Sequence, residues 1–147
     1  LWTTLKHLFR RKVTIKYPEE VREMSPVARL QHMLMRDEEG KERCTACGLC
    51  ALSCPAEAIT MKAAERKADE KHLYREEKYA EIYEINMLRC IFCGLCEEAC
   101  PKEAIYLTKS KKIVKSGYER EDFIYGKDKL VMPLDMAIKN TQTNTVN

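Results

Sequence analysis

The 147-residue sequence lacks any apolar run near the roughly 20 residues of a transmembrane helix, so we expect that it does not span a bilayer. Its first residues show no long apolar segment followed by a small-residue cleavage site, as a secretory signal peptide would. No constellation of general acid, base and nucleophile is recognisable, so we predict no separate catalytic site. Glycine and proline are scarce, at five each, and cysteine is absent outside two short stretches. Those two stretches carry the chemical information.

All eight cysteines fall into two copies of one pattern. The first copy is Cys44-x2-Cys47-x2-Cys50-x3-Cys54-Pro55. The second copy has the same spacing and contains Cys90, Cys93, Cys96, Cys100 and Pro101. This run is an established pattern of thiolate ligands for iron–sulfur clusters in bacterial-type ferredoxins. We therefore predict that the cofactors are two [4Fe–4S] clusters.

The spacing within each copy has a physical reason. Three thiolates at every third residue let a short coil wrap one corner of an Fe4S4 cube, which leaves the fourth iron without a ligand. The fourth cysteine precedes a proline that fixes φ and stops the loop, so it points toward the neighbouring cube. Gly48 and Gly94 tolerate positive φ and let the backbone pass close to each cube. The predicted ligand sets therefore cross over, with Cys44, Cys47, Cys50 and Cys100 for cluster 1 and Cys90, Cys93, Cys96 and Cys54 for cluster 2.

Two other uses of cysteine compete with this interpretation. A disulfide framework is typical of small secreted chains, whereas eight free thiolates call for a reducing compartment such as the bacterial cytoplasm or its organellar equivalent. Structural zinc is the stronger competitor, because Cys-x2-Cys is a common half-site. Zinc sites usually pair two such halves across a dozen or more residues, and the dense spacing here leaves awkward thiols for tetrahedral sites.

The internal repeat is longer than the cysteine pattern. Residues 44–61 align without gaps on residues 90–107, 46 positions later, and ten of the eighteen positions are identical. After each proline we predict a short helical turn and then a strand, Ile59–Met61 or Ile105–Leu107. Apolar residues of the repeat are expected to enclose the clusters and limit water access, namely Ala56, Ala58, Ile59, Ile91, Phe92, Ala104 and Ile105.

The small number of apolar residues limits how much stability burial alone can give this core. A core of about 65 residues is too small to rely on apolar burial alone, and few large apolar residues lie between Cys44 and Leu107. Metal ligation couples folding to cofactor insertion, so we predict that the chain without its clusters is largely unfolded.

The stretch between the two copies, residues 62–88, is charged and contains no glycine. Its first half has mixed charges at helical spacing, which predicts a solvated helix or excursion. In its second half, Tyr79–Met87 alternates and predicts a strand that leads into the second copy. His72 lies in the polar part and is expected to be exposed to solvent rather than to act as a ligand.

The first twelve residues have the pattern of an interfacial amphipathic helix, with basic residues largely off its apolar face. Residues 1–16 carry five Lys or Arg and no acid, although the net charge of the chain is only +3. A helix at the membrane surface against a membrane-embedded partner is favoured over docking on a partner protein alone, and no nucleic-acid partner is expected. The apolar face consists of Leu1, Trp2, Leu5, Leu8 and Phe9.

The next segment leads from this helix to the first cysteine. Val13–Tyr17 alternates like a short strand, and Pro18 ends it. Within Ser25–Arg43, Gly40 predicts a turn, and the apolar run of residues 33–35 (Met33, Leu34 and Met35) is expected to pack in the core.

These flanking segments, more than the cysteines, carry a resemblance to a known family. The sequence begins with the basic amphipathic helix, continues through VTIKYPEE, and includes YEREDFIYGKDKL after the second copy. The approach to the first copy contains Arg29, His32, Leu34, Arg36, Gly40, Glu42, Arg43 and Cys44 in the order RxxHxLxR and GxERC. Over roughly residues 1–131 the chain resembles the ferredoxin-like chain I subunits of NADH:quinone oxidoreductase, respiratory complex I. It differs at Leu30, where family members usually have glycine.

The resemblance implies a function. The chain would sit in the peripheral arm next to the membrane, on the cytoplasmic face of the bacterial inner membrane or the matrix face if organellar. Electrons would pass from cluster 1 to cluster 2 and on to the terminal cluster of a neighbouring subunit, which reduces quinone. Partners would include that subunit and a membrane-embedded subunit. A related subunit of a membrane-bound hydrogenase-type complex, a freely diffusing ferredoxin and a zinc-bound structural module remain alternatives.

The expected fold class is α+β, with a ferredoxin-like core of pseudo-twofold repeat, an N-terminal amphipathic helix and an extended C-terminal tail. We divide the chain into residues 1–43 for docking to membrane or partners, residues 44–108 for the two-cluster domain, and residues 109–147 as an extension that wraps partners. The polar end of that extension, Pro133–Asn147, is expected to be disordered or to lie over a partner.

Overall fold

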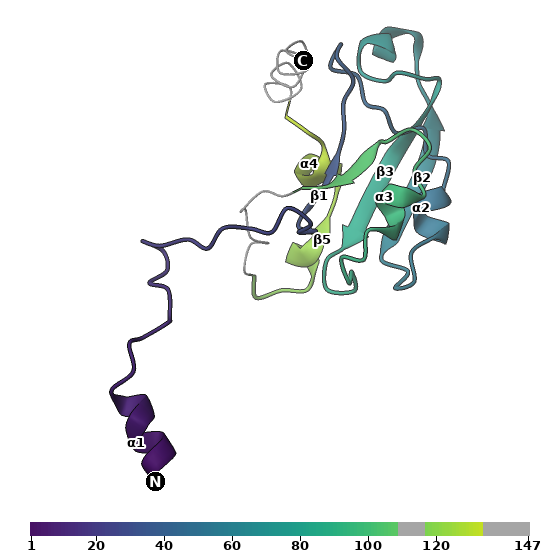
Figure 1. Cartoon of the computed structure of the whole chain (residues 1–147). Helices are drawn as coiled ribbons and strands as arrows, with labels where there is room; N and C mark the ends of the chain where they lie inside the picture. The colour runs from purple at the N-terminus through teal and green to yellow at the C-terminus, as the bar shows by residue number, and fades with distance from the viewer. Residues whose placement is uncertain (109–116, 134–147) are drawn as a thin grey trace.

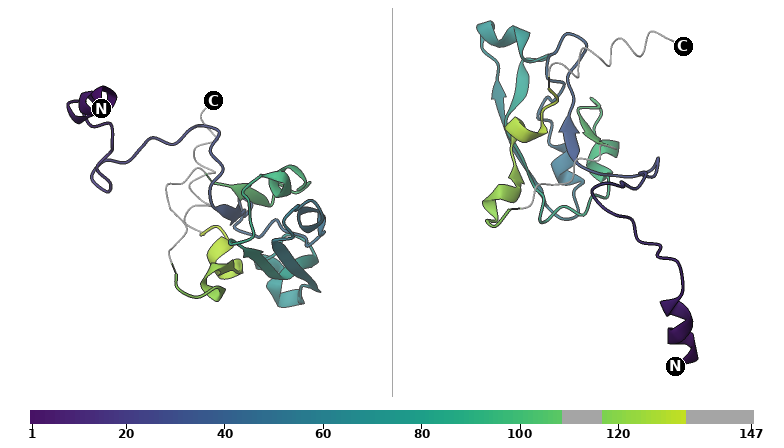
Figure 2. Two further views of the ribbon diagram at one scale, coloured as in Figure 1. Left: turned by 90° about the horizontal axis from the view of Figure 1, so that it is seen from below. Right: turned by 90° about the vertical axis from the view of Figure 1, so that its left-hand side faces the viewer.

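The computed structural model describes residues 1–108 and 117–133 of the chain. It has a small α+β body, from which residues 1–28 extend as a long N-terminal arm (Figures 1 and 2). In chain order the elements are α1 (Trp2–Leu8), β1 (His32–Leu34), α2 (Leu49–Leu52), β2 (Ile59–Glu65), the 3-10 helix η1 (Ala68–His72), β3 (Lys78–Asn86), α3 (Leu95–Glu98), β4 (Ile105–Leu107), the 3-10 helix η2 (Glu121–Phe123), β5 (Ile124–Tyr125) and α4 (Lys127–Leu130).

Two small antiparallel sheets form the frame of the body. In one sheet, β1 pairs with β4, so that Leu34 lies opposite Ile105. In the other, β3 lies between β2 and β5, and Ile85 pairs with both Ile59 and Tyr125. Because β2 and β4 belong to equivalent parts of the repeat, each half of the body has its own sheet. The α+β fold with an internal pseudo-twofold repeat is therefore confirmed.

The backbone repeats as closely as the sequence. Gly48 and Gly94 have φ angles of 86° and 85° and form the N-caps of α2 and α3. Their left-handed conformation is one that glycine adopts without the Cβ penalty, as the sequence predicted. Two further positive-φ positions of the first half recur 46 positions later in the second, since Ala46 matches Phe92 and Glu57 matches Glu103.

The segment that follows each proline is not helical. Glu57 and Glu103 have φ angles of 46° and 47°, and their amides close turns onto the carbonyls of Cys54 and Cys100 at 3.2 Å. The predicted helical turn is therefore wrong, because a single left-handed residue redirects the chain straight into the strand. The predicted strand at Ile105–Leu107 is β4, and the other one is β2, which continues to Glu65.

The stretch between the two copies is mostly a hairpin. The charged first half continues β2 through a register shift at Lys62/Ala63 and then forms η1. Of the predicted solvated helix or excursion, only this short 3-10 turn is helical. The predicted strand is confirmed as β3, in which Tyr83 and Ile85 are buried; Met87, also buried, follows its last residue. His72 is exposed, as predicted.

Chain segments outside the repeat complete the core. Leu34 is 3% exposed and bridges to Val131 in parallel, while Leu130 of α4 is 1% exposed. Met33 and Met35 are only half-buried, so the expected core packing holds fully for Leu34 alone. Gly40 forms the predicted turn, with φ of 81°. The flanks therefore supply one strand to each sheet and the helix that covers them.

A buried ion pair holds three segments together. The Lys127 ammonium lies 2.7 Å from a Glu42 carboxylate oxygen and donates to the Ala80 carbonyl at 2.8 Å. It also sits 5.0 Å from the ring centroid of Tyr74, which stacks on Tyr79. The two charged side chains are only 19% and 13% exposed. Such a paired, hydrogen-bonded charge is stabilising as long as both partners are present.

We expect Lys127→Met to lower the free energy of unfolding by about 2 kcal/mol, because it leaves the Glu42 carboxylate buried without its partner. Denaturant titration of the cluster-loaded chain measures this effect. Lys129→Met is the matched control, since Lys129 is exposed two residues away, and should cost no more than about 0.5 kcal/mol. Equal losses in the two variants would contradict the role of the pair.

The N-terminal arm makes few contacts with the body. Helix α1 is shorter than the twelve-residue pattern, and every residue from 1 to 27 is exposed. The predicted strand Val13–Tyr17 is wrong, because the structure gives that segment no strand partner within the described residues. No helix in residues 1–108 or 117–133 has the length and apolar character needed to cross a membrane. Of the predicted C-terminal tail, residues 134–147 lie outside the described part.

Candidate cluster-binding sites

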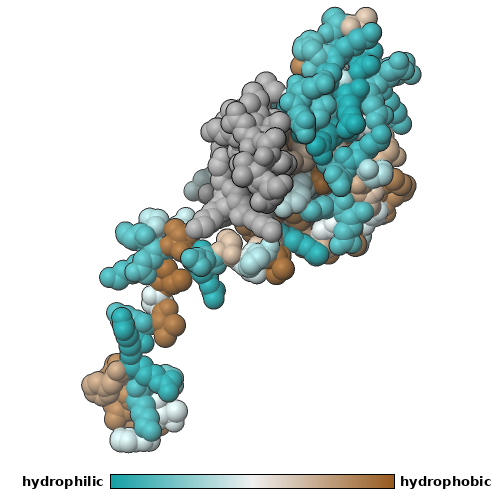
Figure 3. Space-filling model, turned by 45° about the horizontal axis from the view of Figure 1, so that its top comes forward, coloured by the Kyte–Doolittle hydropathy of each residue, from teal (hydrophilic) through white to brown (hydrophobic). Residues whose placement is uncertain are grey.

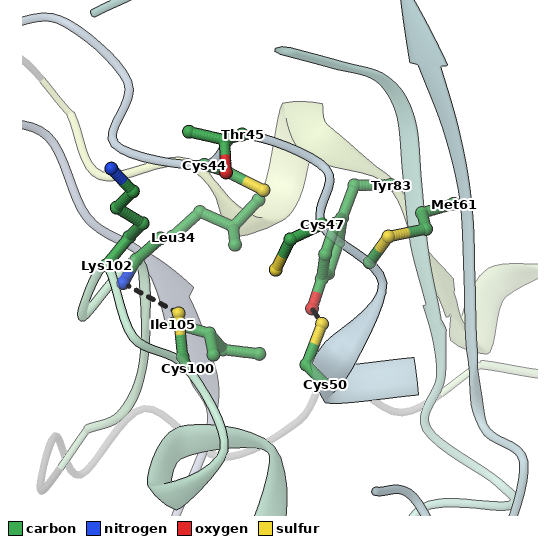
Figure 4. A pocket seen from close by; sticks show the side chains of 11 residues that line it. Leu34, Cys44, Thr45, Cys47, Cys50, Met61, Tyr83, Cys100, Lys102 and Ile105 are labelled. Carbon is green, nitrogen blue, oxygen red and sulfur yellow. Dashed lines mark hydrogen bonds between the residues drawn. The ribbon is translucent and has the colours of Figure 1, made fainter. Parts of the chain in front are cut away.

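The body contains two cavities lined by cysteines. Residues from both halves line the first cavity, which is about 340 Å³ including its open mouth. Its four sulfur atoms point toward one another across this space (Figure 4). The cysteines of the first cavity are Cys44, Cys47, Cys50 and Cys100.

The second cavity is similar in size, at about 320 Å³ including its mouth. Its cysteines are Cys54, Cys90, Cys93 and Cys96. In each cavity, three cysteines come from one copy of the pattern and the fourth comes from the other copy. The fourth cysteine follows a short helix, α2 or α3, and these helices lie against each other, which carries each fourth cysteine across to the neighbouring cavity.

Backbone amides approach the sulfur atoms in the same way in both halves. The Ala58 amide donates to Cys54 Sγ at 3.4 Å, and the Ala104 amide donates to Cys100 Sγ at 3.2 Å. The Phe92 amide likewise donates to Cys90 Sγ at 3.4 Å. Amide hydrogen bonds of this kind stabilise negative charge on sulfur ligands. The repeat therefore gives both cavities nearly the same set of main-chain donors.

The thiols are free and mostly shielded from solvent. None of the eight is in a disulfide, Cys50 and Cys96 are buried, and only Cys47 is exposed. Burial raises the pKa of Cys44 to about 11 and that of Cys96 to about 12. Thiolates in such a site need a compensating positive charge, which iron provides, and loading the site releases protons.

The lining fits a cluster better than a single ion. No three histidine, cysteine, aspartate or glutamate side chains in residues 1–108 and 117–133 are placed to hold one metal ion. Four thiols spread around a mostly apolar cavity suit a larger group with several metal atoms. All eight cysteines lie in the described residues, and four of them line each cavity.

Most of the predicted apolar enclosure lines these cavities. Ala104 and Ile105 line the first cavity, and Ala56, Ala58 and Ile59 line the second. Ile91 also lines the second cavity, although 64% of it is exposed. Phe92 lines neither cavity and instead packs on the hydrophobic core and on the ring of His32.

Two buried polar side chains near the sulfur atoms were not assigned a role from the sequence. The Tyr83 hydroxyl lies 3.3 Å from Cys50 Sγ, and His32 Nε2 lies 3.8 Å from Cys90 Sγ. Burial raises the pKa of Tyr83 far above its ordinary value and lowers the pKa of His32 to about 4. Tyr83 therefore keeps its proton and His32 is neutral at pH 7. The sequence signal that could have indicated them is a tyrosine or histidine at a strand position that pairs with a strand of the repeat.

The Arg29 side chain contacts the second cysteine motif. Its guanidinium donates a hydrogen bond to the Cys93 carbonyl and lies 3.8 Å from Glu98. A Cβ on Gly94 would come within 3.0 Å of Arg29 Nε, whereas one on Gly48 would meet nothing within 4 Å. A guanidinium therefore lies beside Gly94 of the second motif, whereas no atom of the described residues takes that place at Gly48.

Comparison with known proteins identifies this arrangement. Residues 43–104 match the model of the 4Fe-4S dicluster domain. The chain is 80% identical over its full length to NADH-quinone oxidoreductase subunit I of Flavobacterium psychrophilum and covers 80% of that protein. The chain belongs to this family. It is also 69% identical over 131 residues to subunit I of Cytophaga hutchinsonii, covering 89% of this chain and 74% of that protein.

Two more distantly related proteins also resemble the chain. Subunit 9 of the Thermus thermophilus NADH-quinone oxidoreductase is 46% identical over 132 residues, covering 90% of this chain and 71% of that protein. A chain from the solved structure of the membrane-bound sulfane sulfur reductase, an archaeal respiratory membrane complex, superposes with a TM-score of 0.59 at 26% identity. The comparison covers 92% of this chain and 64% of that one.

Membership of the subunit I family establishes the function at a coarse level. The chain is an electron-transfer iron–sulfur subunit of NADH-quinone oxidoreductase and carries two [4Fe–4S] clusters. It works with other subunits of a membrane-associated respiratory complex. The free ferredoxin and the zinc module are not favoured by these relatives.

Proposed function

We propose that Cys44, Cys47, Cys50 and Cys100 ligate cluster 1 and that Cys90, Cys93, Cys96 and Cys54 ligate cluster 2. The observation that carries this proposal is that each set of four lines one cavity. The main-chain donors to Cys54 and Cys100 also support their role as ligands of negative character.

The clusters supply one-electron redox chemistry, and the residues of this chain supply position and environment. Tight β pairing on each side of the cavities fixes the ligands, which limits the rearrangement that accompanies each electron transfer. Apolar lining from Ile59, Met61 and Ile105 limits access of water to the sulfur atoms. No acid–base step is required of any side chain.

The relay is proposed to run from cluster 1 to cluster 2 and then to the terminal cluster of a neighbouring subunit, which reduces quinone. Each motif supplies one cysteine to the other motif's cavity, and α2 contacts α3 between them. This arrangement suits a two-step path through neighbouring centres. The direction of transfer and the terminal-cluster partner rest on the family resemblance. We propose the same division of labour along the chain, with residues 1–43 for docking, 44–108 for the clusters and 109–147 for contacts with partners.

The N-terminal arm is proposed to lie at the membrane surface against a membrane-embedded subunit, on the cytoplasmic face of the bacterial inner membrane. Trp2, Leu8 and Phe9 are 70%, 74% and 82% exposed, which is costly unless another surface covers them. Apolar side chains gather on one side of α1 and recur along the arm (Figure 3). The basic residues of the arm suit anionic lipid headgroups beside that apolar face.

We expect Leu5→Glu to reduce recovery of this chain with membranes and with its companion subunits by about tenfold. Burying a charge in place of a leucine on the apolar face opposes docking. The measurement is native purification through a C-terminal tag in mild detergent, with identification and quantification of the companion subunits. Thr3→Glu adds the same charge on the opposite face of α1 and should leave recovery nearly unchanged.

Two outcomes would contradict the proposal. If the unsubstituted protein emerges alone and soluble at low salt, it is not a subunit docked in this way. If Leu5→Glu and Thr3→Glu behave alike, the apolar face of α1 is not the docking surface.

A further inference from the structure

Two buried polar side chains occupy equivalent places in the two halves. Met61 and Leu107 are equivalent residues of the repeat, 46 positions apart. Met61 pairs with Tyr83 across the β2–β3 ladder, and Leu107 pairs with His32 across the β1–β4 ladder. Tyr83 and His32 come from segments outside the repeat, and the register of the strands alone brings them to matching positions.

Each of these side chains reaches one cysteine of its own half. Tyr83 is 1% exposed, and Cys50 Sγ, at 3.3 Å, is the only hydrogen-bond partner of its hydroxyl among the described residues. A buried hydroxyl without a partner would be costly, so the sulfur contact satisfies it. Figure 4 shows the Tyr83 hydroxyl directed at Cys50 at the wall of the first cavity.

The geometry of His32 favours donation from Nε2. His32 is 3% exposed, its Nε2 faces Cys90 Sγ, and its Nδ1 is buried without a hydrogen-bond partner among the described residues. A neutral imidazole has one N–H, and placing it on Nδ1 would bury a donor with no acceptor. The N–H therefore belongs on Nε2, where a sulfur ligand accepts it. At 3.8 Å this contact is longer and weaker than that of Tyr83.

We propose that Tyr83 and His32 are positioning residues that donate hydrogen bonds to the ligands Cys50 and Cys90 and thereby raise the reduction potentials of cluster 1 and cluster 2, respectively. The proposal rests on the ligand sets given under Proposed function. Reduction adds negative charge to a cluster and its sulfur atoms, so a donor to sulfur stabilises the reduced form more than the oxidised form. The main-chain donors repeat in both halves, whereas these two side chains differ in chemistry and distance. They allow each cluster to be tuned separately.

The test for Tyr83 is Tyr83→Phe, which removes only the hydroxyl. We expect the reduced-to-oxidised ratio of cluster 1 at a fixed potential to fall about threefold, or roughly 30 mV at 59 mV per tenfold for one electron. Potentiometry monitored by electron paramagnetic resonance on the purified complex measures each cluster, and cluster 2 should not move. Tyr79→Phe, in the same strand but stacked on Tyr74, is the matched control.

The test for His32 compares two replacements. His32→Leu removes the donor and should lower the ratio for cluster 2 about twofold, or roughly 20 mV on the same conversion, with cluster 1 unchanged. His32→Gln keeps an N–H at a similar reach and should restore most of the shift. If His32→Leu fails to assemble, the glutamine variant is combined with pulsed resonance of the unsubstituted complex in D2O. Backbone amides near the sulfur atoms also exchange in D2O. The expected result is therefore a deuteron coupling to cluster 2 that changes in His32→Gln and a deuteron coupling to cluster 1 that is lost in Tyr83→Phe.

The inference is overturned if neither potential moves, if both move equally in either variant, or if Tyr79→Phe has the same effect as Tyr83→Phe. Deuteron couplings that are the same in these variants and in the unsubstituted complex would overturn it as well. These results are distinct from a failure of the ligand assignment, which would show as the wrong cluster being lost when Cys54 or Cys100 is replaced.

Discussion

The Cys54→Ala variant is expected to lose cluster 2 and to keep cluster 1. Cys54 belongs to the first copy of the pattern but lines the cavity of Cys90, Cys93 and Cys96. Its removal leaves one iron of that cluster without a thiolate and leaves the Ala58 amide without its sulfur acceptor. We expect the signal of intact cluster 2 to fall at least about tenfold, on the scale seen when supporting groups of metal sites are removed.

The measurement is iron content together with the paramagnetic signals of the reduced complex. Cys100→Ala provides the reciprocal case and should remove cluster 1, because Cys100 lines the first cavity. Ser53→Ala, one residue before Cys54, is the matched control and should leave both signals intact. If Cys54→Ala instead removed the cluster of Cys44, Cys47 and Cys50, the ligand sets would not cross.

Removal of iron is expected to unfold most of the body of the chain. Among the residues that the structure describes, the large side chains that are less than 2% exposed are Tyr83, Ile85 and Leu130. Two cavities lie between the sheets and the short helices, and without clusters their thiols and apolar walls have nothing to pack against. Cluster binding then contributes much of the folding free energy, as in other small metal-dependent domains.

Far-UV circular dichroism of the reconstituted chain before and after chelation of iron measures this loss. We expect the cooperative thermal transition to disappear and to return when iron and sulfide are restored. Lys129→Met, which is exposed, should show the same dependence on iron and serves as a control for nonspecific effects. A native-like spectrum with a cooperative transition after complete removal of iron would refute this expectation.

Local spacing in the sequence was enough to predict the cofactors and the strands β3 and β4. It was not enough for the segments that follow Pro55 and Pro101, where one left-handed glutamate replaces the predicted helical turn. The charge pattern also predicted a helix after Met61, but these residues continue β2. Pairing with β3 overrides the helical spacing of their charges.

The polar contacts of the sites depend on pairings that no local pattern contains. His32 reaches Cys90 only because β1 pairs with β4, in which its partner Leu107 lies 75 positions later in the sequence. Tyr83 was predicted to lie in an alternating strand, yet its contact with Cys50 depends on the register against Met61. The ligand assignment itself stays a prediction until the cysteine variants are measured.

The exchange of the fourth cysteine between the two cavities has a consequence for biogenesis. Each cavity is complete only when the opposite motif has folded, so filling one orders part of the other. Filling of the two cavities should therefore be cooperative in the chain that has all eight cysteines. When iron is scarce, a population of these chains would divide into empty and fully loaded molecules, and few would carry a broken relay with a single centre.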